Sequence, residues 1–272
     1  MAKRSAIGKC ALCGKRRVLR RSHLMPKSLY AMTRVQKGKI AENPILITQR
    51  LSVQSSKQVR AHLLCNECED RFNKGGENYS LTQVHDGIDF PLLDRMNVAM
   101  PVQVEPRIGV SLYSASAMGV SWEKLAYFAL SIFWRASVHR WPLPAGGTIW
   151  NSLGPHEPAV RSYLLGKGTF PLGLVLMVTV CTDWQSQGGF WSPALVVGST
   201  IPSLGLLTRG IHFRLFLASN LPPDIKRLCI ATGSQHFIAM GNCRKISEHA
   251  YVHLMKTSRE AASLSKTLRA QR

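Results

Sequence analysis

The chain has 272 residues, of which 45% are hydrophobic and 18% charged, a balance typical of folded globular proteins that excludes wholesale disorder. Its formal net charge of +20 indicates a polyanionic partner. The longest apolar runs, LAYFALSIFW and LGLVLMVTVC, fall well short of the roughly 20 residues that a membrane-spanning helix needs. With no secretory signal in the sequence either, we expect a cytoplasmic protein that does not enter a membrane.

Positive charge is concentrated near the N-terminus. Residues 1–85 carry 17 Lys or Arg against 5 acids, and no acid precedes Glu42. A run of basic residues that is so little opposed is typical of surfaces that bind phosphate backbones. The sequence therefore predicts binding to nucleic acid, with DNA the expected form, through Arg16, Arg17, Arg20, Arg21, Lys27, Arg60 and Arg71.

Four of the seven cysteines form two C-x-x-C pairs, Cys10 with Cys13 and Cys65 with Cys68. A C-x-x-C turn places two sulfur atoms on one side of a metal ion at about 2.3 Å, so two such turns fit a structural, tetrahedral Zn²⁺. Disulfides are the alternative, but the odd cysteine count and the nucleic-acid-like charge favour a reducing compartment. We expect the other three, Cys181, Cys229 and Cys243, to be free thiols that act as small buried hydrophobes.

The segments around the second pair predict a compact module. The alternating ILITQRLSV (45–53) predicts a hairpin, preceded by a basic loop over 33–39. After Cys65 we expect a short helix that places Glu69 and Asn73 on one face and stops at Gly75 and Gly76. Two cysteine turns, a hairpin and a helix are the plan of a treble-clef zinc module, which we assign to residues 1–80.

The rest of the chain predicts a linker and packing segment (81–116) and an α+β domain (117–272). Ser121 can cap a long apolar helix that Pro142 stops, and we expect this to be the buried central helix, with Arg135 and His139 as a structural polar pair on one face. A short helix is expected over 157–166 and a last one over 247–268, where His249 and His253 form a surface pair. A mixed or antiparallel sheet is expected from the apolar runs at 172–180, 194–198, 211–219, 227–232 and 235–240. The role of this domain is open between substrate recognition, docking of a protein partner and dimerisation.

The motifs CALCGK, SHLMPKS and LLCNECED give residues 10–79 a resemblance to the HNH-type, or ββα-metal, endonucleases. With the later FPLLD and FWRASVHRW, the sequence is more narrowly similar to bacterial HNH-like proteins. The resemblance implies that His23 is the general base that activates water. It implies that Glu69 and Asn73, which stand where the family often has histidines, are catalytic residues that hold Mg²⁺ or Mn²⁺, with Glu77 as a further candidate. Two positions depart from the family pattern: Ser22 stands before the histidine and Arg60 stands in place of the orienting asparagine.

These observations lead to three hypotheses, and they leave open whether the chain is an enzyme. The first is a zinc-stabilised HNH-like endonuclease that cleaves DNA with a divalent metal ion. The second is a non-catalytic zinc module that binds nucleic acid. The third is a zinc-stapled interaction module whose charge serves a protein partner.

Overall fold

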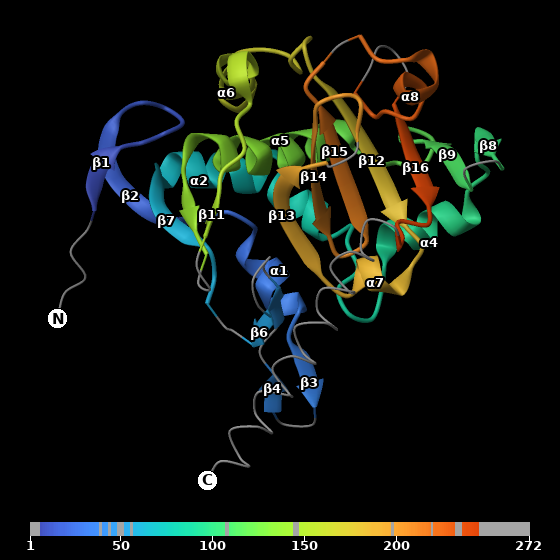
Figure 1. Cartoon of the computed structure of the whole chain (residues 1–272), viewed down its shortest axis with the longest axis horizontal. Coiled ribbons are helices and arrows are strands. Elements are labelled where there is room, and N and C mark those ends of the chain that lie inside the picture. Colours follow the sequence, from blue (N-terminus) through green and yellow to red (C-terminus); the bar gives the residue numbers. More distant parts are fainter. Residues whose placement is uncertain are drawn as a thin grey trace.

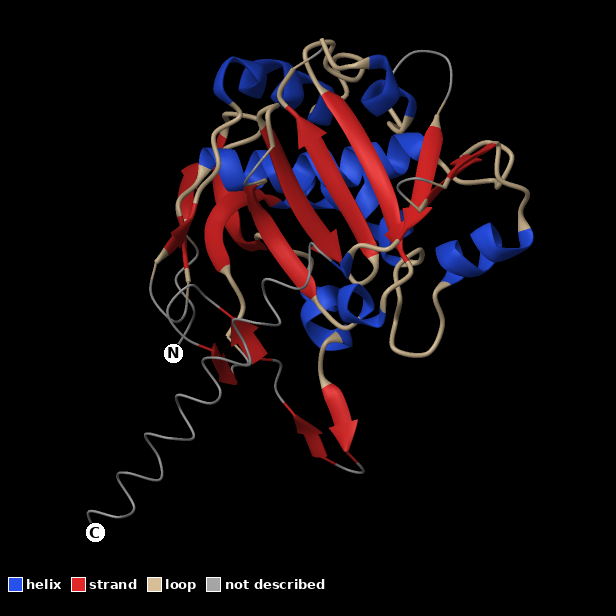
Figure 2. Ribbon diagram, turned by 45° about the vertical axis from the view of Figure 1, so that its right-hand side comes forward, coloured by secondary structure: helices blue, strands red, loops and turns tan. Residues whose placement is uncertain are grey.

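The structure is a computed structural model that describes residues 6–37, 40–42, 45–47, 52–54, 57–106, 109–143, 147–196, 199–218, 220–231 and 236–244. It is a mixed α+β fold, as the sequence predicted, in which a seven-stranded sheet packs on one long helix (Figures 1 and 2). No helix within these described ranges has the length and apolar character to span a bilayer. The predicted helix over 247–268, with His249 and His253, lies outside the described residues.

The N-terminal part is built on a three-stranded antiparallel sheet of order β1–β2–β7. Two short hairpins stand between β2 and β7 in the chain, and the second confirms the one expected over 45–53. Of the expected basic loop, Val35–Lys37 instead form a strand that pairs antiparallel with Ile40–Glu42, and 38–39 lie outside the described residues. The elements are β1 (Ile7–Lys9), β2 (Arg16–His23), α1 (Lys27–Met32), β3 (Val35–Lys37), β4 (Ile40–Glu42), β5 (Ile45–Ile47), β6 (Ser52–Gln54) and β7 (Arg60–Cys65).

The helix after Cys65 does not stop at Gly75 and Gly76, which corrects the prediction. It runs from α2 (Asn66–Phe72) through a π-helical turn, η1 (Asn73–Glu77), into α3 (Asn78–Leu81). A Cβ on Gly76 would overlap the carbonyl oxygen of Lys124, and one on Gly75 would overlap the Tyr127 ring. The two glycines therefore let this helix approach its neighbour closely, rather than ending it.

That neighbour is α5 (Trp122–Val138), the buried central helix predicted from the sequence. Ser121 caps it by accepting a hydrogen bond from the Lys124 amide, and eleven of its 17 residues are buried. Large side chains such as Phe133 and Trp134 are fully buried, and each contributes roughly 1.5–3 kcal/mol through the apolar surface removed from water. One hydrophobic core runs from the cysteine turns through α5 to the large sheet.

The large sheet has the order β13-β14-β15-β12-β16-β9-β8, and all neighbours are antiparallel except β12 and β16. Phe213 of β15 stacks edge-on against Phe128, so this face of the sheet covers α5 (Figure 2). Two of its strands, β8 and β9, come from the segment expected to be a linker. The described part of the run at 227–232 forms no strand and contributes an isolated bridge between Met177 and Cys229; its first residue, Arg227, ends α8.

The remaining elements complete the second part of the chain. They are α4 (Pro91–Val98), β8 (Gln103–Glu105), β9 (Val110–Ser114), β10 (Trp141–Pro142), β11 (Thr148–Ile149), η2 (Gly154–His156), α6 (Glu157–Leu164), β12 (Val175–Cys181), α7 (Trp184–Gln187), β13 (Phe190–Leu195), β14 (Ser203–Thr208), β15 (Ile211–Phe216), α8 (Pro223–Arg227) and β16 (Phe237–Gly241).

Three arginines of the second part donate hydrogen bonds to backbone carbonyls of the first. Arg135 of α5 reaches the carbonyl of His23 at 2.7 Å, and Arg161 of α6 reaches that of Leu12 at 2.6 Å. Arg209, in the turn between β14 and β15, donates to the carbonyl of Met32. These contacts fix the cysteine-bearing sheet and α1 against the second part.

Candidate functional site

The four cysteines predicted to bind zinc come together. Their sulfur atoms all lie within 4.8 Å of one another, and the Sγ atoms of Cys13 and Cys65 are 3.9 Å apart. Tetrahedral Zn²⁺ with bonds of about 2.3 Å needs sulfur atoms about 3.8 Å apart, so the donor set fits that ion. This four-cysteine cluster, formed by Cys10, Cys13, Cys65 and Cys68, could therefore hold a metal such as zinc.

Backbone hydrogen bonds shape both cysteine turns. The Gly14 amide donates to the Cys10 carbonyl, and Gly14 has a φ of 74°, a conformation in which an L side chain is strained. Cys65 ends β7, and its amide donates to the Cys10 sulfur at 3.3 Å. Burial raises the pKa of the Cys65 and Cys68 thiols, so a cation at the centre is what would favour their thiolate forms.

His23 is the last residue of β2 and lies half-buried on the sheet that carries the four-cysteine cluster. Its Nε2 atom is 2.7 Å from Oε1 of Gln58, and its carbonyl accepts the hydrogen bond from Arg135. Burial is the main cause that lowers the pKa of His23, with Arg60 and Arg135 acting in the same direction and Gln58 and Glu69 opposing them. This lowered pKa favours the neutral imidazole, the form that a general base requires.

Glu69 carries an oxygen that has no partner. Its Oε1 atom is buried, and no described residue gives it a hydrogen bond. The carboxylate acts on the pKa of His23, so the two side chains lie within electrostatic range. A buried carboxylate oxygen without a donor is costly, and a divalent cation is one group that would offset the cost.

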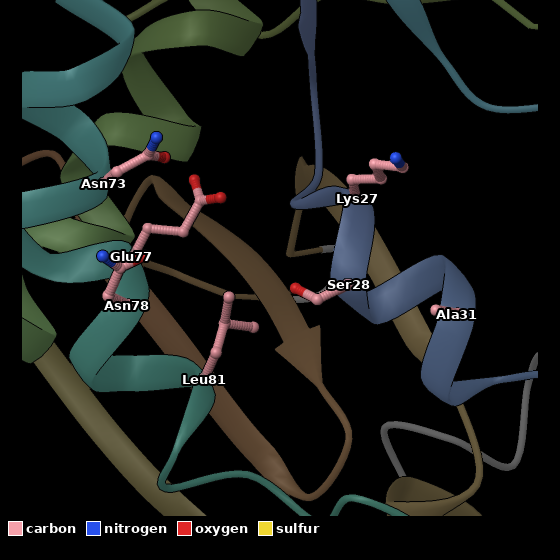
Figure 3. Close-up of a pocket in the computed structure, with 7 residues that line it drawn as sticks. All are labelled: Lys27, Ser28, Ala31, Asn73, Glu77, Asn78 and Leu81. Atoms are coloured by element: carbon pink, nitrogen blue, oxygen red, sulfur yellow. The ribbon is translucent and has the colours of Figure 1, made fainter.

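Asn73 and Glu77 line an open hollow of about 640 Å³ between η1 and α1 (Figure 3). Lys27 and Ser28 of α1 form the opposite wall, and the Glu77 carboxylate points into the space between them. The sequence placed Glu69 and Asn73 on one helical face, and α2 continues into η1 with that spacing. Within the described ranges, however, neither His23 nor Glu69 belongs to a cluster of three or more His, Cys, Asp or Glu ligand atoms.

The positions that depart from the HNH pattern have other tasks here. Ser22 is buried and its hydroxyl accepts a hydrogen bond from the Leu64 amide, which takes it away from any metal site. Arg60 is exposed and pairs with His23 across the strands. Gln58, which the sequence did not single out, holds the histidine ring instead. No motif pointed to Gln58, because its contact with His23 depends on the course of the chain just before β7.

Arg135 makes different contacts from the pairing with His139 that the sequence predicted. It does not pair with His139, whose ring lies edge-on against Trp141. Its Nη2 atom instead faces Oε2 of Glu77 at 3.4 Å. The expected i, i+4 pairing on one helical face was wrong, because α5 ends at Val138 and the extended backbone of the C-cap His139 turns its side chain away.

The predicted nucleic-acid-binding residues are on the surface, with Arg17 only partly exposed. Arg17 forms an ion pair with Glu67, so its charge is partly neutralised. No ion pair is found for the other six among the described residues, and they are exposed on β2, α1, β7 and α2: Arg16, Arg20, Arg21, Lys27, Arg60 and Arg71.

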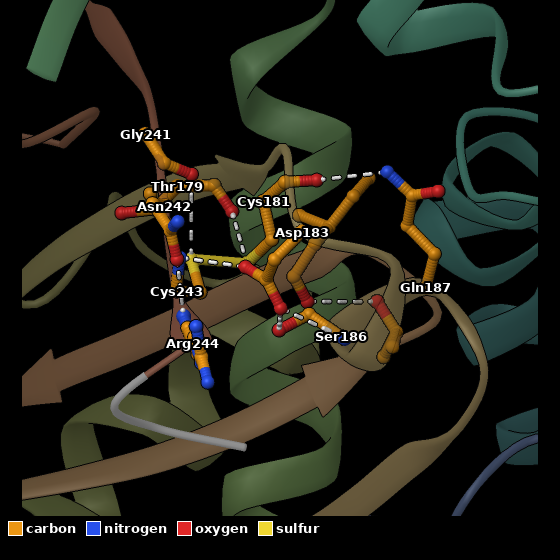
Figure 4. The surroundings of a disulfide bond; sticks show 11 residues. Thr179, Cys181, Asp183, Ser186, Gln187, Gly241, Asn242, Cys243 and Arg244 are labelled. Carbon is orange, nitrogen blue, oxygen red and sulfur yellow. Dashed lines mark hydrogen bonds between the residues drawn. A yellow bond between two sulfur atoms is a disulfide. The ribbon is translucent and has the colours of Figure 1, made fainter. Parts of the chain in front are cut away.

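Two of the three remaining cysteines are not free, which corrects the prediction. Cys181 and Cys243 form a disulfide that joins the last residue of β12 to the segment just after β16 (Figure 4). The Asp183 carboxylate beside it accepts hydrogen bonds from the Cys243 amide and from Ser186. Cys229 is a buried free thiol, as expected. The pair lies 62 residues apart in the sequence, and only the parallel β12–β16 pairing brings the two together.

No protein-family model matches this sequence, and neither a curated protein nor a solved structure matches the chain.

Proposed function

We propose that the protein is an HNH-like endonuclease that hydrolyses DNA phosphodiester bonds with a divalent metal ion. The observation that carries the proposal is the buried, unpartnered Oε1 of Glu69 in electrostatic range of a neutral, half-buried histidine. By the resemblance to the HNH family, His23 matches the general base and Glu69 stands where the family often has a histidine. The two cysteine turns, the hairpin and the helix would then be the treble-clef module, with Zn²⁺ in the four-cysteine cluster.

His23 is the general base in this proposal. An Nε2 proton donated to Gln58 leaves the Nδ1 lone pair free to take a proton from water. The lowered pKa of His23 favours the neutral ring that can accept this proton. Gln58 fixes the plane of the ring, the task that the family gives to an asparagine.

The acidic residues are the proposed ligands of Mg²⁺ or Mn²⁺. Glu69 would supply its unpartnered oxygen, and Asn73 or Glu77 would supply a second one from the hollow. A bound divalent ion would stabilise the negative charge that develops on the phosphate and the leaving oxygen. The exposed arginines on β2, with Lys27 and Arg71, would hold the phosphate backbone through charge.

The proposal is tested by incubating the zinc-loaded protein with plasmid DNA and with structured RNA, in Mg²⁺, Mn²⁺ or EDTA. His23→Ala and Glu69→Gln should abolish nicking, whereas the exposed controls His62→Ala and Asp70→Asn should keep it. Metal-dependent nicking that persists in both site variants would overturn the assignment of this site. The outcome on RNA decides between DNA and RNA as the substrate.

A second candidate is a zinc module that binds nucleic acid without cleaving it. It is favoured by the exposed basic residues of β2, which do not depend on a second metal. Salt-sensitive binding to DNA without cleavage in any metal would support it over the nuclease. If neither DNA nor RNA binds, a protein partner or a dimer formed through the second part becomes the better hypothesis.

A further inference from the structure

Arg135 is a charged residue in the interior of the protein. It lies on the central helix α5, and only 2% of its side chain is exposed. Its Nη1 donates to the His23 carbonyl at 2.7 Å, and its Nη2 faces Oε2 of Glu77 at 3.4 Å. The two partners are 112 and 58 residues away in the sequence.

The rest of the guanidinium is held by its own helix and by an aromatic ring. Its Nε donates to the Ser131 carbonyl at 3.2 Å, and Nη2 also reaches the Ser131 hydroxyl at 3.2 Å. The guanidinium lies over the Phe72 ring at 5.3 Å from its centre. These contacts hold the planar guanidinium in one orientation, so its Nη1 and Nη2 atoms have fixed positions.

We propose that Arg135 is a positioning residue that sets the distance between His23 and Glu77 in the candidate active site. This inference rests on the proposed function. The guanidinium contacts β2 through Nη1 and η1 through Nη2, so the two elements cannot move independently. Because Nη2 faces one oxygen of Glu77, it fixes the direction of the carboxylate that points into the hollow (Figure 3).

A purely structural role is the competing explanation, since burying an unpaired arginine is costly. Arg161 is the matched control, because it also crosses from the second part to a carbonyl of the first but touches neither His23 nor Glu77. Arg135→Lys keeps the positive charge but loses the planar guanidinium with its two Nη donors, and Arg135→Gln loses both the charge and the guanidinium. Zinc content and thermal unfolding show which variants are folded. If both Arg135 variants fail to fold, Glu77→Gln tests the same contact from its less buried partner.

The first readout is steady-state cleavage of DNA. In Arg135→Lys we expect kcat to fall about 10- to 100-fold with KM unchanged, because a displacement of the base by about 1 Å has that effect. Arg161→Lys should keep kcat. Glu77→Gln should lower kcat at least as much, because it removes a candidate metal ligand together with the contact, and the double variant should lose no more than Glu77→Gln alone. An Arg135→Lys enzyme with normal kcat, or losses that multiply in the double variant, would overturn the proposal.

The second readout does not need activity. The charged groups that act on His23 are Arg60 of β7, Glu69 of α2 and Arg135 of α5. NMR titration of the His23 ring should show a pKa that rises in Arg135→Gln and stays unchanged in Arg161→Gln. An unchanged His23 pKa in folded Arg135→Gln would overturn the inference. A wild-type protein that cleaves nothing but shows the pKa change refutes the proposed nuclease while supporting the contact of Arg135 with the His23 region.

Discussion

Replacing Cys68 with serine tests the four-cysteine cluster. A serine hydroxyl does not replace a thiolate, so the cluster keeps three of its four sulfur donors. Structural zinc sites contribute roughly 10–16 kcal/mol in apparent binding free energy at pH 7, so one ligand of four is worth about 3 kcal/mol. We therefore expect Cys68→Ser to weaken zinc binding by roughly a hundredfold or more and to lower the thermal midpoint.

The assay is zinc content by elemental analysis, zinc affinity by chelator competition, and thermal unfolding. Wild-type protein should hold one zinc ion per chain. The control is Cys229→Ser, because Cys229 is fully buried but lies in a separate apolar cluster. If Cys68→Ser binds zinc as tightly as wild type, or if the two variants lose the same stability and neither loses zinc, the cluster does not hold a structural metal.

Three further predictions concern stability. Burial lowers the pKa of His212 to about 4, so the unfolded chain takes up a proton there first as the pH falls. Stability should therefore drop by up to about 3 kcal/mol between pH 6.5 and 4, and urea unfolding of His212→Gln should show a smaller drop in this window. The Cys181–Cys243 disulfide closes a loop of 62 residues, worth up to about 4 kcal/mol by chain entropy, so a reducing agent should lower the thermal midpoint of wild type but not of Cys181→Ser. Gly76→Ala should cost about 2 kcal/mol by forcing η1 away from α5, whereas Gly189→Ala, whose Cβ would meet nothing within 4 Å, should cost little in the same unfolding assay.

The sequence predicted the features that local chemistry decides. Ser121 caps α5 as expected, and Pro158 lies in the first turn of α6. The four-cysteine cluster was also predictable, because each C-x-x-C turn is local and a buried thiolate pair needs a second pair to complete a metal site. Binary patterning found β12, β15 and β16, whose apolar faces alternate or are continuous.

The features that sequence reasoning missed depend on distant partners. Gly75 and Gly76 have the composition of a helix stop, but the approach of α5 gives them a different role. The β8 and β9 strands lie in a segment whose prolines suggested a linker, and pairing of β9 with β16 makes them part of the sheet. Gln58 carries no motif, since its importance comes from a single contact with His23 across the fold.

The three crossing arginines explain why the two parts of the chain form one unit. Each guanidinium loses hydration at the contact, and a carbonyl of the other part supplies one of the hydrogen bonds that replace it. If the two parts were only partly docked, the arginine charges would be buried without these carbonyl partners. The contact between the two parts is therefore favourable only when docking is complete. Phe72 and Leu12, fully covered in the shared core, add the apolar contribution. In the proposal made above, Arg135 of the second part also holds His23 and Glu77 at a defined separation.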